Sequence, residues 1–300
     1  MKKQELLRTA LFVPGNRPDL VDKAVRTDAD AIIIDLEDTV PPPQKEETRH
    51  IVRQKIIEHG DRGIIARING LESEYMRGDL HEVVVKELSS ILMPKVEKRA
   101  DIEEINRLLR EEETKNRIPI GNISIIPLIE SAMAVENSFR IASTRTDPDR
   151  LLTLAFGAAD FALDMGITLT KTGEELSYAR SRLAVACRAA GVEPPLDTPF
   201  MLDLTDREAL QEDIRRARQQ GFQGKLCIHP NQVEICNRLF SPSEDEIEYA
   251  RKVIRSFENA EACGVAAIQM DGKFIDYPIV ERAKHVLRLA EMGNRRQNTV

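Results

Sequence analysis

Short apolar runs recur along the chain, and each is closed by turn-forming or charged residues. They are too short for free-standing helices and too continuously apolar for half-exposed strands. The pattern therefore predicts strands buried on both faces, as in a parallel sheet. Eight runs fit this description: residues 10–13, 31–34, 63–66, 91–93, 124–129, 151–156, 199–202 and 225–228.

Helical patterns follow the strands. Asn16, with Pro18 in the first turn, is expected to cap a helix after the first strand, and Thr205 with Glu208 forms a capping box after the seventh. Eight alternating strand–helix units within residues 1–240 predict a TIM (β/α)8 barrel. A doubly wound sheet is the competing fold, but no GxGxxG motif follows the first strand and no GxxxxGK[ST] motif occurs.

Residues 241–300 form a second region that the barrel does not need in order to close. Ser243 and Glu246 make another capping box, which opens a helix. Asp271-Gly272 lies between two short apolar stretches and predicts a hairpin turn. With a final helix from about Pro278, this gives a helix–hairpin–helix extension, which we expect to act as a lid or subunit contact.

The last residues, 293–300, are expected to be disordered. The net charge of −7 and the lack of a basic cluster argue against a nucleic-acid partner. Every apolar run is too short to cross a membrane or to act as a signal peptide. The four cysteines show no CxxC or other zinc spacing. We therefore expect a soluble, cytoplasmic protein with reduced thiols.

Charged residues recur at the carboxyl ends of the predicted strands, where ligands of α/β sheets bind. Glu130 and Asp160 follow the fifth and sixth strands. Two carboxylates that leave room for waters and a chelating substrate suit Mg²⁺, and Mn²⁺ accepts the same ligands. The alternative is that either acid merely caps the next helix. The predicted rim residues are Arg17, Asp35, Glu37, Asp38, Arg67, Lys95, Glu130, Asp160 and His229.

Several of these residues have a structural alternative. Arg67 is placed to clamp a carboxylate or thioester oxygen, but it could instead form an ion pair with Glu37 or Asp38. Lys95 could form a Schiff base in an aldolase, although a carboxylate pair suited to a metal makes the metal-assisted route simpler. His229, beside Pro230, could be a structural histidine.

Seven motifs together resemble the citrate lyase β-subunit-like proteins, the acyl-CoA lyases of the HpcH/HpaI aldolase superfamily. They run in that family's order from about residue 8 to residue 290 and are specific for the family but not for a member's substrate. The motifs are LFVPGNR from residue 11, DLED from 35, RIN from 67, PLIES from 127, FGAAD from 156, KLCIHP from 225 and DGKFIDYP from 271.

This resemblance implies a TIM barrel that binds Mg²⁺ through Glu130 and Asp160. It implies reversible cleavage of a 3-hydroxyacyl-CoA, such as malyl-, citramalyl- or citryl-CoA, to acetyl-CoA (or propionyl-CoA) and a 2-oxo acid. Family members assemble as trimers or hexamers in which the C-terminal segment closes over a neighbour's site. By that similarity, Asp276 would act in trans.

The chemistry of such a cleavage suggests roles for the individual side chains. Arg67 would stabilise the enolate oxygen left on the thioester. Asp276 would protonate the enolate carbon, with Glu37 as an orienting or proton-shuttling group. The residues expected to bind substrate or CoA are Arg67, Arg17, Asn16, Lys95 and His229.

Two other enzymatic interpretations remain open. One is a divalent-metal aldolase acting on free 2-oxo acids without CoA. The other is a citrate lyase β subunit that works on an acyl-carrier-protein thioester in a complex with α and acyl-carrier subunits. A purely structural or binding role leaves the rim carboxylates unexplained. The sequence does not identify the acyl group.

Overall fold

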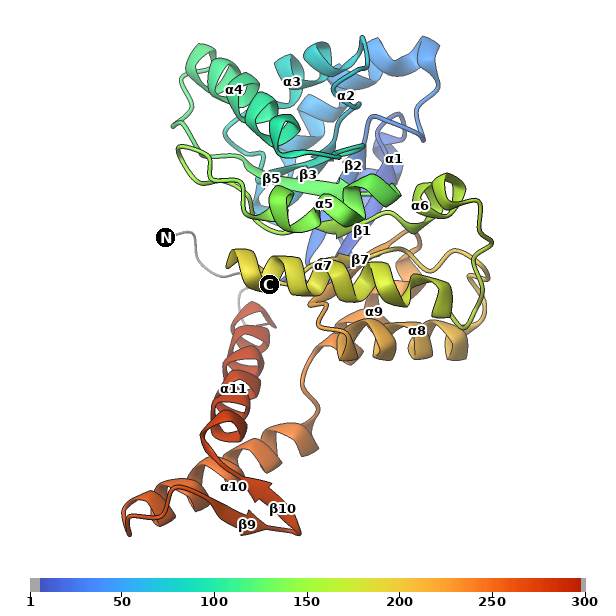
Figure 1. The fold of residues 1–300 in the computed structure, drawn as a ribbon. Coiled ribbons are helices and arrows are strands. Elements are labelled where there is room, and N and C mark those ends of the chain that lie inside the picture. Colours follow the sequence, from blue (N-terminus) through green and yellow to red (C-terminus); the bar gives the residue numbers. More distant parts are fainter. Residues whose placement is uncertain (1–5, 298–300) are drawn as a thin grey trace. The chain divides into compact units, whose positions relative to one another are not determined.

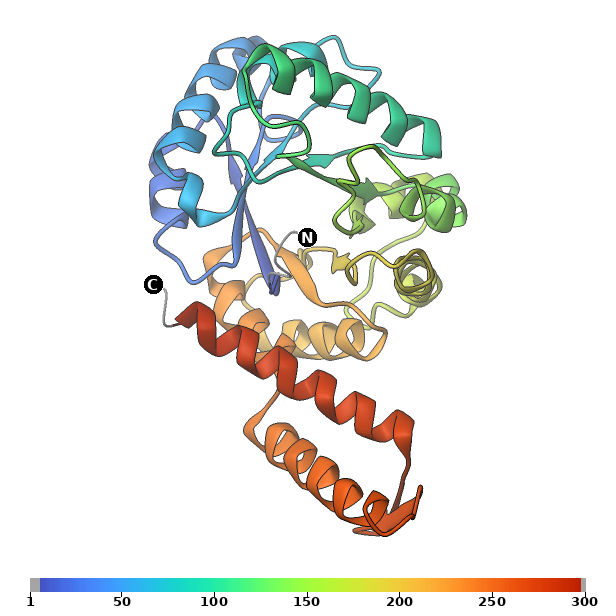
Figure 2. The same cartoon turned by 90° about the vertical axis from the view of Figure 1, so that its left-hand side faces the viewer.

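The computed structural model describes residues 6–297, which divide into two compact units, Leu7–Asn237 and residues 238–297 with Leu6. The larger unit is a closed barrel of eight parallel strands in chain order. Strand β1 pairs with both β2 and β8, which closes the ring. Helices surround the strands, as the barrel part of Figures 1 and 2 shows. The predicted (β/α)8 barrel is thereby confirmed.

The barrel strands are β1 (Thr9–Pro14), β2 (Ala31–Asp35), β3 (Ile64–Arg67), β4 (Ser90–Met93), β5 (Ser124–Ile129), β6 (Ala155–Phe156), β7 (Leu196–Asp197) and β8 (Gly224–Cys227). The α-helices of this unit are α1 (Pro18–Ala24), α2 (Lys45–Glu58), α3 (Met76–Val83), α4 (Arg99–Lys115), α5 (Ala132–Ala142), α6 (Ala158–Met165), α7 (Ser177–Ala190), α8 (Arg207–Gln219) and α9 (Pro230–Phe240). Three 3-10 turns accompany them, η1 (Pro42–Gln44), η2 (Gly60–Arg62) and η3 (Glu174–Leu176).

The continuously apolar strands are explained by burial on both faces. Alternate residues such as Ile33 in β2 and Leu128 in β5 belong to one buried cluster to which most of the strands contribute. Their neighbours Ile32, Ile34 and Ile129 are equally buried outside that cluster. Because successive side chains of a strand point to opposite faces, one set fills the barrel and the other meets the helices.

The prediction for the seventh strand was wrong. The ladder uses Leu196–Asp197 rather than residues 199–202, and Leu202 is exposed. Asp197 is fully buried because it accepts hydrogen bonds from Arg180 and Lys225. A search for apolar runs overlooks a strand whose buried residue is charged and neutralised by distant partners.

The sixth strand is shorter than predicted, because residues 151–156 form an isolated bridge at Leu151 and then β6. Between them, the Thr153 hydroxyl donates to the carbonyls of Glu193 and Pro194. Pro194 and Pro195 have no N–H to extend a ladder on that side. The neighbouring chain is therefore held by a side chain instead of by regular strand pairing.

Two predicted helix caps were also wrong. Arg17 occupies the N-cap position of α1, and the Asn16 amide donates to Gln44 at 2.7 Å instead. Asp206, not Thr205, caps α8 by accepting from the backbone N–H of Ala209. No side chain caps α1, because Asn16 bonds to Gln44, whereas at α8 the neighbouring Asp206 is the capping residue.

The smaller unit contains α10 (Glu244–Glu261), β9 (Ile268–Met270), β10 (Lys273–Ile275) and α11 (Tyr277–Gln297). The capping box of Ser243 and Glu246 is present. Asp271 and Gly272 both have positive φ, 51° and 73°, as a two-residue hairpin turn with right-handed strand twist requires.

This unit has its own apolar core, which includes Val253, Phe257, Ile275 and Val280. Helix α11 continues to Gln297, so the expectation of disorder from residue 293 was wrong for residues 293–297. Residues 298–300 lie outside the described residues. Within residues 6–297, no helix is long and apolar enough to span a bilayer.

Candidate active site

The centre of the rim is an ion pair between the last residues of two neighbouring strands. Asp35 ends β2 and Arg67 ends β3, and the two are paired in the ladder. Arg67 donates from Nε to Asp35 Oδ1 at 2.6 Å and from Nη2 to Oδ2 at 2.7 Å. This planar, bidentate contact fixes the guanidinium at the carboxyl edge of the barrel.

Asp35 also organises the loop that follows β2. Its carboxylate accepts from the backbone N–H groups of Glu37 and Thr39 and from the Thr39 hydroxyl. Burial by itself would raise the pKa of Asp35, but the hydrogen bonds and charge of Arg67 hold that pKa below its ordinary value. Asp35 is therefore an ionised structural anchor.

Arg67 reaches two further carboxylates. Its Nη1 lies 3.1 Å from Asp38 Oδ2 and 3.3 Å from Glu37 Oε2, and its guanidinium stacks over Phe12, 5.0 Å from the ring centroid. The expected ion pairs with Glu37 and Asp38 thus exist, and Asp35 is the stronger partner. Hydrogen bonds to Asp35 and Asp38 use three of the five guanidinium N–H donors, and Nη1 also faces Glu37, so at most two donors remain for a substrate oxygen.

Glu37 is a buried carboxylate in a mixed electrostatic environment. Burial raises its pKa to about 7, against the opposing charges of Arg67 and Lys95. The Lys95 ammonium lies 3.4 Å from Glu37 Oε1. A carboxyl group that titrates near neutrality can both accept and donate a proton.

Lys95 does not have the properties of a Schiff-base lysine. The nearby Glu37 charge raises the pKa of its ammonium, and the side chain is two-thirds exposed. An amine nucleophile needs a lowered pKa so that its neutral form is available. The geometry instead favours the metal-assisted alternative.

The backbone of Lys95 holds Glu130. Lys95 has a positive φ of 56°, rare for a residue with a side chain, and its N–H donates to Glu130 Oε1 at 2.6 Å. Glu130 is buried just after β5. Burial raises its pKa to about 8, and the charges of Glu37 and Asp160 add to this effect against the Lys95 hydrogen bond.

Asp160 lies in the first turn of α6 and is exposed, close enough for its charge to act on Glu130. Gly157, which precedes α6, approaches Glu130 so closely that a Cβ there would lie 2.9 Å from Glu130 Oε2. A buried carboxylate disfavoured by neighbouring negative charge is the environment that a bound cation relieves. The donor set of Glu130 and Asp160 therefore fits a hard divalent metal.

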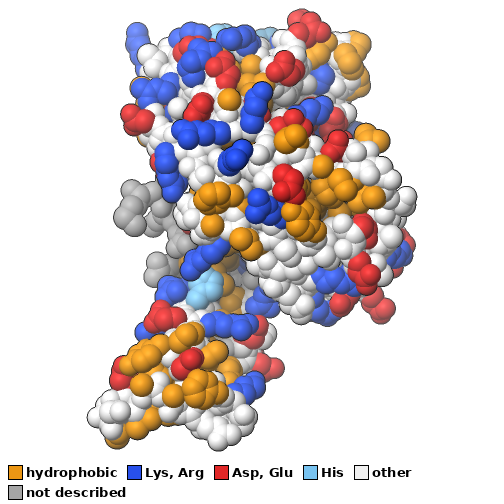
Figure 3. Space-filling view, viewed as in Figure 1, with side chains coloured by type: hydrophobic (Ala, Val, Ile, Leu, Met, Phe, Trp, Pro, Cys, Tyr) orange, Lys and Arg blue, Asp and Glu red, His pale blue; other side chains and the backbone are white. Residues whose placement is uncertain are grey.

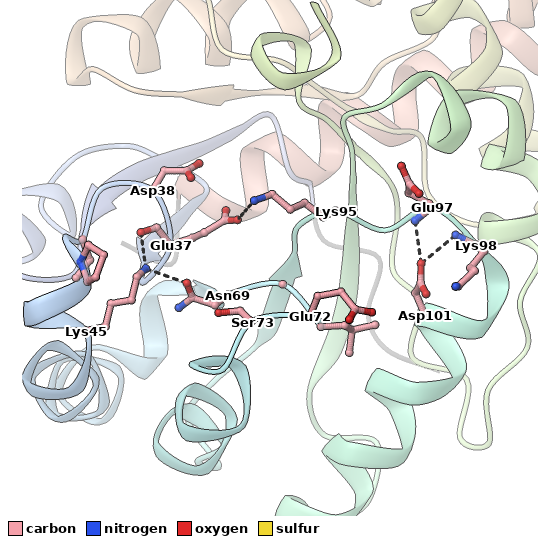
Figure 4. Close-up of a pocket in the computed structure, with 14 residues that line it drawn as sticks. Glu37, Asp38, Lys45, Asn69, Glu72, Ser73, Lys95, Glu97, Lys98 and Asp101 are labelled. Carbon is pink, nitrogen blue, oxygen red and sulfur yellow. Dashed lines mark hydrogen bonds and ion pairs between the residues drawn. The ribbon is translucent and has the colours of Figure 1, made fainter. Parts of the chain in front are cut away.

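A cavity of about 490 Å³ opens beside the loop after β2, and Arg67, Glu130 and Asp160 are not among the residues that line it. Its wall includes Glu37, Asp38, Lys95, Asn69 and Ser73. In Figure 4, Lys95 points to Glu37 across the cavity and Lys45 reaches the same loop from α2. The cavity gives Glu37 and Asp38 access to a ligand larger than a metal ion.

The other predicted binding residues have local partners. Arg17 is exposed and makes a bidentate contact with Asp19. His229 Nδ1 accepts a hydrogen bond from the Asn231 N–H at the start of α9. Their roles in substrate binding stay predictions.

Asp276 belongs to the smaller unit. Its carboxylate accepts from the Ile279 N–H and its carbonyl from the Val280 N–H, so it caps the start of α11, whose first residue is Tyr277. The side chain is partly exposed.

The sequence did not reveal the support under the loop after β2. Lys45, Arg49 and Asp79 are helical residues that join Asn69 in a network of hydrogen bonds. Only Asn69 lay in a recognised motif. The others follow no strand end and have no characteristic spacing, so no signal marked them.

Among the described residues, one group of three side chains has the spacing of a metal site, Asp22, Glu58 and His59. The Lys55 ammonium donates to both carboxylates of this group. A protein cation already occupies that position, so we assign it to helix packing.

Comparison with known proteins identifies the family. Residues 8–230 match the model of the HpcH/HpaI aldolase/citrate lyase family. The chain belongs to this family. The predicted family is thus confirmed, and with it the general class of enzyme, a lyase.

Family relatives cover nearly the whole chain. The citrate lyase subunit beta of Leuconostoc mesenteroides subsp. cremoris is 36% identical over 98% of this chain and 96% of its own length. The L-malyl-CoA/beta-methylmalyl-CoA lyase of Rhodobacter capsulatus is 32% identical over 96% of each chain. The solved structure of CitE from Mycobacterium tuberculosis, in complex with magnesium, acetoacetate and coenzyme A, is 27% identical, with a TM-score of 0.77 over 95% of this chain and 98% of that one.

Proposed function

We propose that this protein is a magnesium-dependent lyase that cleaves a 3-hydroxyacyl-CoA of the malyl-, citramalyl- or citryl-CoA type. The products are acetyl-CoA, or propionyl-CoA, and a 2-oxo acid, and the reaction is reversible. The observation that carries the proposal is the rim itself, where Arg67 faces two carboxylates beside the buried Glu130. The relative named as a malyl-CoA lyase and the neighbour with magnesium and coenzyme A support it.

In this proposal Glu130 and Asp160 hold the metal, and the Lys95 N–H fixes the orientation of Glu130. When bound, Mg²⁺ supplies a Lewis acid that polarises the hydroxyl or carbonyl oxygen and the carboxylate of the oxo-acid half. Mn²⁺ accepts the same oxygen ligands. The negative rim around Glu130 keeps such a cation in place.

The protein's own groups then act on the thioester half. Breaking the carbon–carbon bond leaves an enolate, and the remaining N–H donors of Arg67 stabilise its oxygen. Because Asp35 already aligns the guanidinium, these donors need no reorganisation. Glu37, with a pKa of about 7, is the proposed group that takes up the proton released by the substrate hydroxyl as the carbon–carbon bond breaks and passes it on. Asp276 is the proposed acid that protonates the enolate carbon.

The test is turnover by the purified protein. We expect release of a 2-oxo acid from malyl-CoA, citramalyl-CoA or citryl-CoA with Mg²⁺, loss of that release with EDTA, and recovery when Mg²⁺ is added back. Free malate, citramalate and citrate are the matched controls, because they lack the thioester. Cleavage that EDTA does not affect would overturn the metal assignment, and cleavage of the free acids would favour the aldolase alternative.

A second candidate is a citrate lyase β subunit acting on an acyl-carrier-protein thioester. It is favoured by the relatives named citrate lyase subunit beta, with 36% and 30% identity over nearly the full chain. The same assay decides between the two. Release of a 2-oxo acid from the carrier-protein thioester, with no turnover of the three CoA thioesters by folded protein, would overturn the CoA proposal in favour of this one.

We also propose that the chain forms a homo-oligomer, a trimer or hexamer, in which the smaller unit serves a neighbour's site. Exposed apolar side chains gather on α5, α6 and α7, where Figure 3 shows orange patches over the same elements. They include Met133, Leu163, Met165, Tyr178 and Val185. Asp276 lies in a unit with its own core, which suits an element that closes over another subunit.

Complementation tests the trans role of Asp276. We expect Asp276→Asn and Glu130→Gln to be inactive alone and to regain part of the activity when co-expressed and purified as mixed oligomers. A mixed assembly then contains sites with an intact Glu130 from one subunit and an intact Asp276 from another. Mixtures that stay inactive, from oligomers shown to contain both chains, would place Asp276 within its own subunit's site.

A further inference from the structure

Lys45, the first residue of α2, is a buried lysine in the wall of the cavity beside the loop after β2. Only 7% of the residue is exposed. Its ammonium donates to the Leu36 carbonyl at 2.9 Å, the Glu37 carbonyl at 2.8 Å and Asn69 Oδ1 at 2.8 Å. An ammonium has three donors, so all of them are used. Two of the three point at the loop that carries Glu37.

The Asn69 side of this arrangement is rigid. The Asn69 amide donates to the Leu36 carbonyl at 3.0 Å and to Asp79 Oδ2 at 2.6 Å, and the Asn69 N–H donates to the same oxygen. Asp79 is fully buried and accepts from Arg49 Nε at 2.8 Å. A satisfied buried network of charges fixes its members more tightly than exposed contacts do.

The loop after β2 is therefore held from two sides. Asp35 accepts hydrogen bonds from the N–H groups of Glu37 and Thr39, while the Lys45 ammonium donates hydrogen bonds to the carbonyls of Leu36 and Glu37. The peptide between Leu36 and Glu37 is thus held at both its carbonyl and its N–H, and the Glu37 side chain points to Arg67 and Lys95. Figure 4 shows Lys45 and Lys95 approaching Glu37 from different elements.

The entry to α2 explains why Lys45 reaches the loop. Residues 41–43 are three prolines, and η1 turns the chain directly into the helix. Proline restricts the backbone, so the first helical residue has little freedom to move. The backbone that carries Lys45 is thus restricted.

We propose that Lys45 is a positioning residue for the lyase reaction: by holding the Leu36 and Glu37 carbonyls, its ammonium fixes the Glu37 carboxylate against Arg67. This inference rests on the proposed function, and it adds a residue outside the rim to that site. Although Lys45 lines the cavity, its three ammonium donors are used by the Leu36 and Glu37 carbonyls and by Asn69, so it acts through the loop.

The test pairs Lys45→Met with Lys55→Met. Lys55 is on the same helix and also makes three hydrogen bonds, but to the carboxylates of Asp22 and Glu58. We expect Lys45→Met to lower kcat by about 100-fold, as a misplaced catalytic group does, with a much smaller change in KM. Lys55→Met is expected to keep kcat and KM unchanged.

A crystal structure of Lys45→Met provides a readout that needs no activity. We expect the Glu37 carboxylate to leave Arg67 Nη1, from which it lies 3.3 Å in the native protein. If the Met variant does not fold, Lys45→Gln, which keeps an uncharged donor, should show a smaller displacement of Glu37 and a correspondingly smaller loss of kcat.

The outcomes separate the two proposals. A loop unchanged in the variant would overturn the positioning role whether or not the protein is a lyase, and so would a displaced loop with unchanged kcat. If the native protein cleaves none of the thioesters, the proposed function fails by itself. The crystal structure would then still decide whether Lys45 sets the position of Glu37.

Discussion

Glu130→Gln is expected to abolish magnesium-dependent turnover, with the largest effect of any single change at the rim. Glutamine preserves the shape and still accepts the Lys95 N–H hydrogen bond, but it carries no charge to hold a cation. Mutation of the outer partners of metal ligands lowers activity or metal affinity by about 10- to 100-fold, and we expect the loss from removing a direct ligand to be larger. Turnover and calorimetric Mg²⁺ binding measure the two consequences separately.

The matched control is Glu136→Gln, the same isosteric change in the helix that follows. Glu136 is exposed on α5 and accepts a hydrogen bond from Tyr178. It should keep native turnover and native Mg²⁺ affinity. Unchanged Mg²⁺ binding in Glu130→Gln would exclude Glu130 as a metal ligand. Metal binding would then not explain why this carboxylate is buried.

Arg67→Lys should lower kcat by about 100- to 1,000-fold, as expected when a donor to a developing oxyanion is lost, while Mg²⁺ affinity stays native. Lysine keeps the charge, but it lacks the planar guanidinium. The guanidinium can bind Asp35 in a bidentate contact and present further N–H donors to a substrate at the same time. We expect a smaller effect than for Glu130→Gln, because one donor is lost and the metal is kept.

The lysine variant is more informative than a neutral one. Arg67→Met would leave Asp35 buried without its partner, and breaking a buried ion pair costs about 3–5 kcal/mol of stability. Arg53→Lys is the control, since the Arg53 guanidinium donates to the Glu82 carbonyl, between α2 and α3 and away from the rim. Native kcat in Arg67→Lys would mean that Arg67 has the purely structural role considered at the outset.

The limits of the sequence are clearest at β7. Apolar runs located the other seven strands because burial on both faces leaves a continuous apolar signal. At β7 the signal pointed to residues 199–202, but the strand contains Asp197, neutralised by Arg180 and Lys225. Those partners lie 17 and 28 residues away in the chain, so no local pattern shows that a charged residue is buried there.

At the candidate site, the sequence by itself determined the barrel, the strand ends and the family. The rim residues could be predicted because parallel strands place their carboxyl ends on one rim of the barrel. Only the tertiary structure decided that Arg67 grips Asp35, that the Lys95 backbone holds Glu130, and that Lys45 supports the Glu37 loop. The physical reason is that hydrophobic periodicity records which faces are buried, whereas hydrogen bonds and ion pairs depend on which polar groups the folded chain brings within about 3 Å of each other.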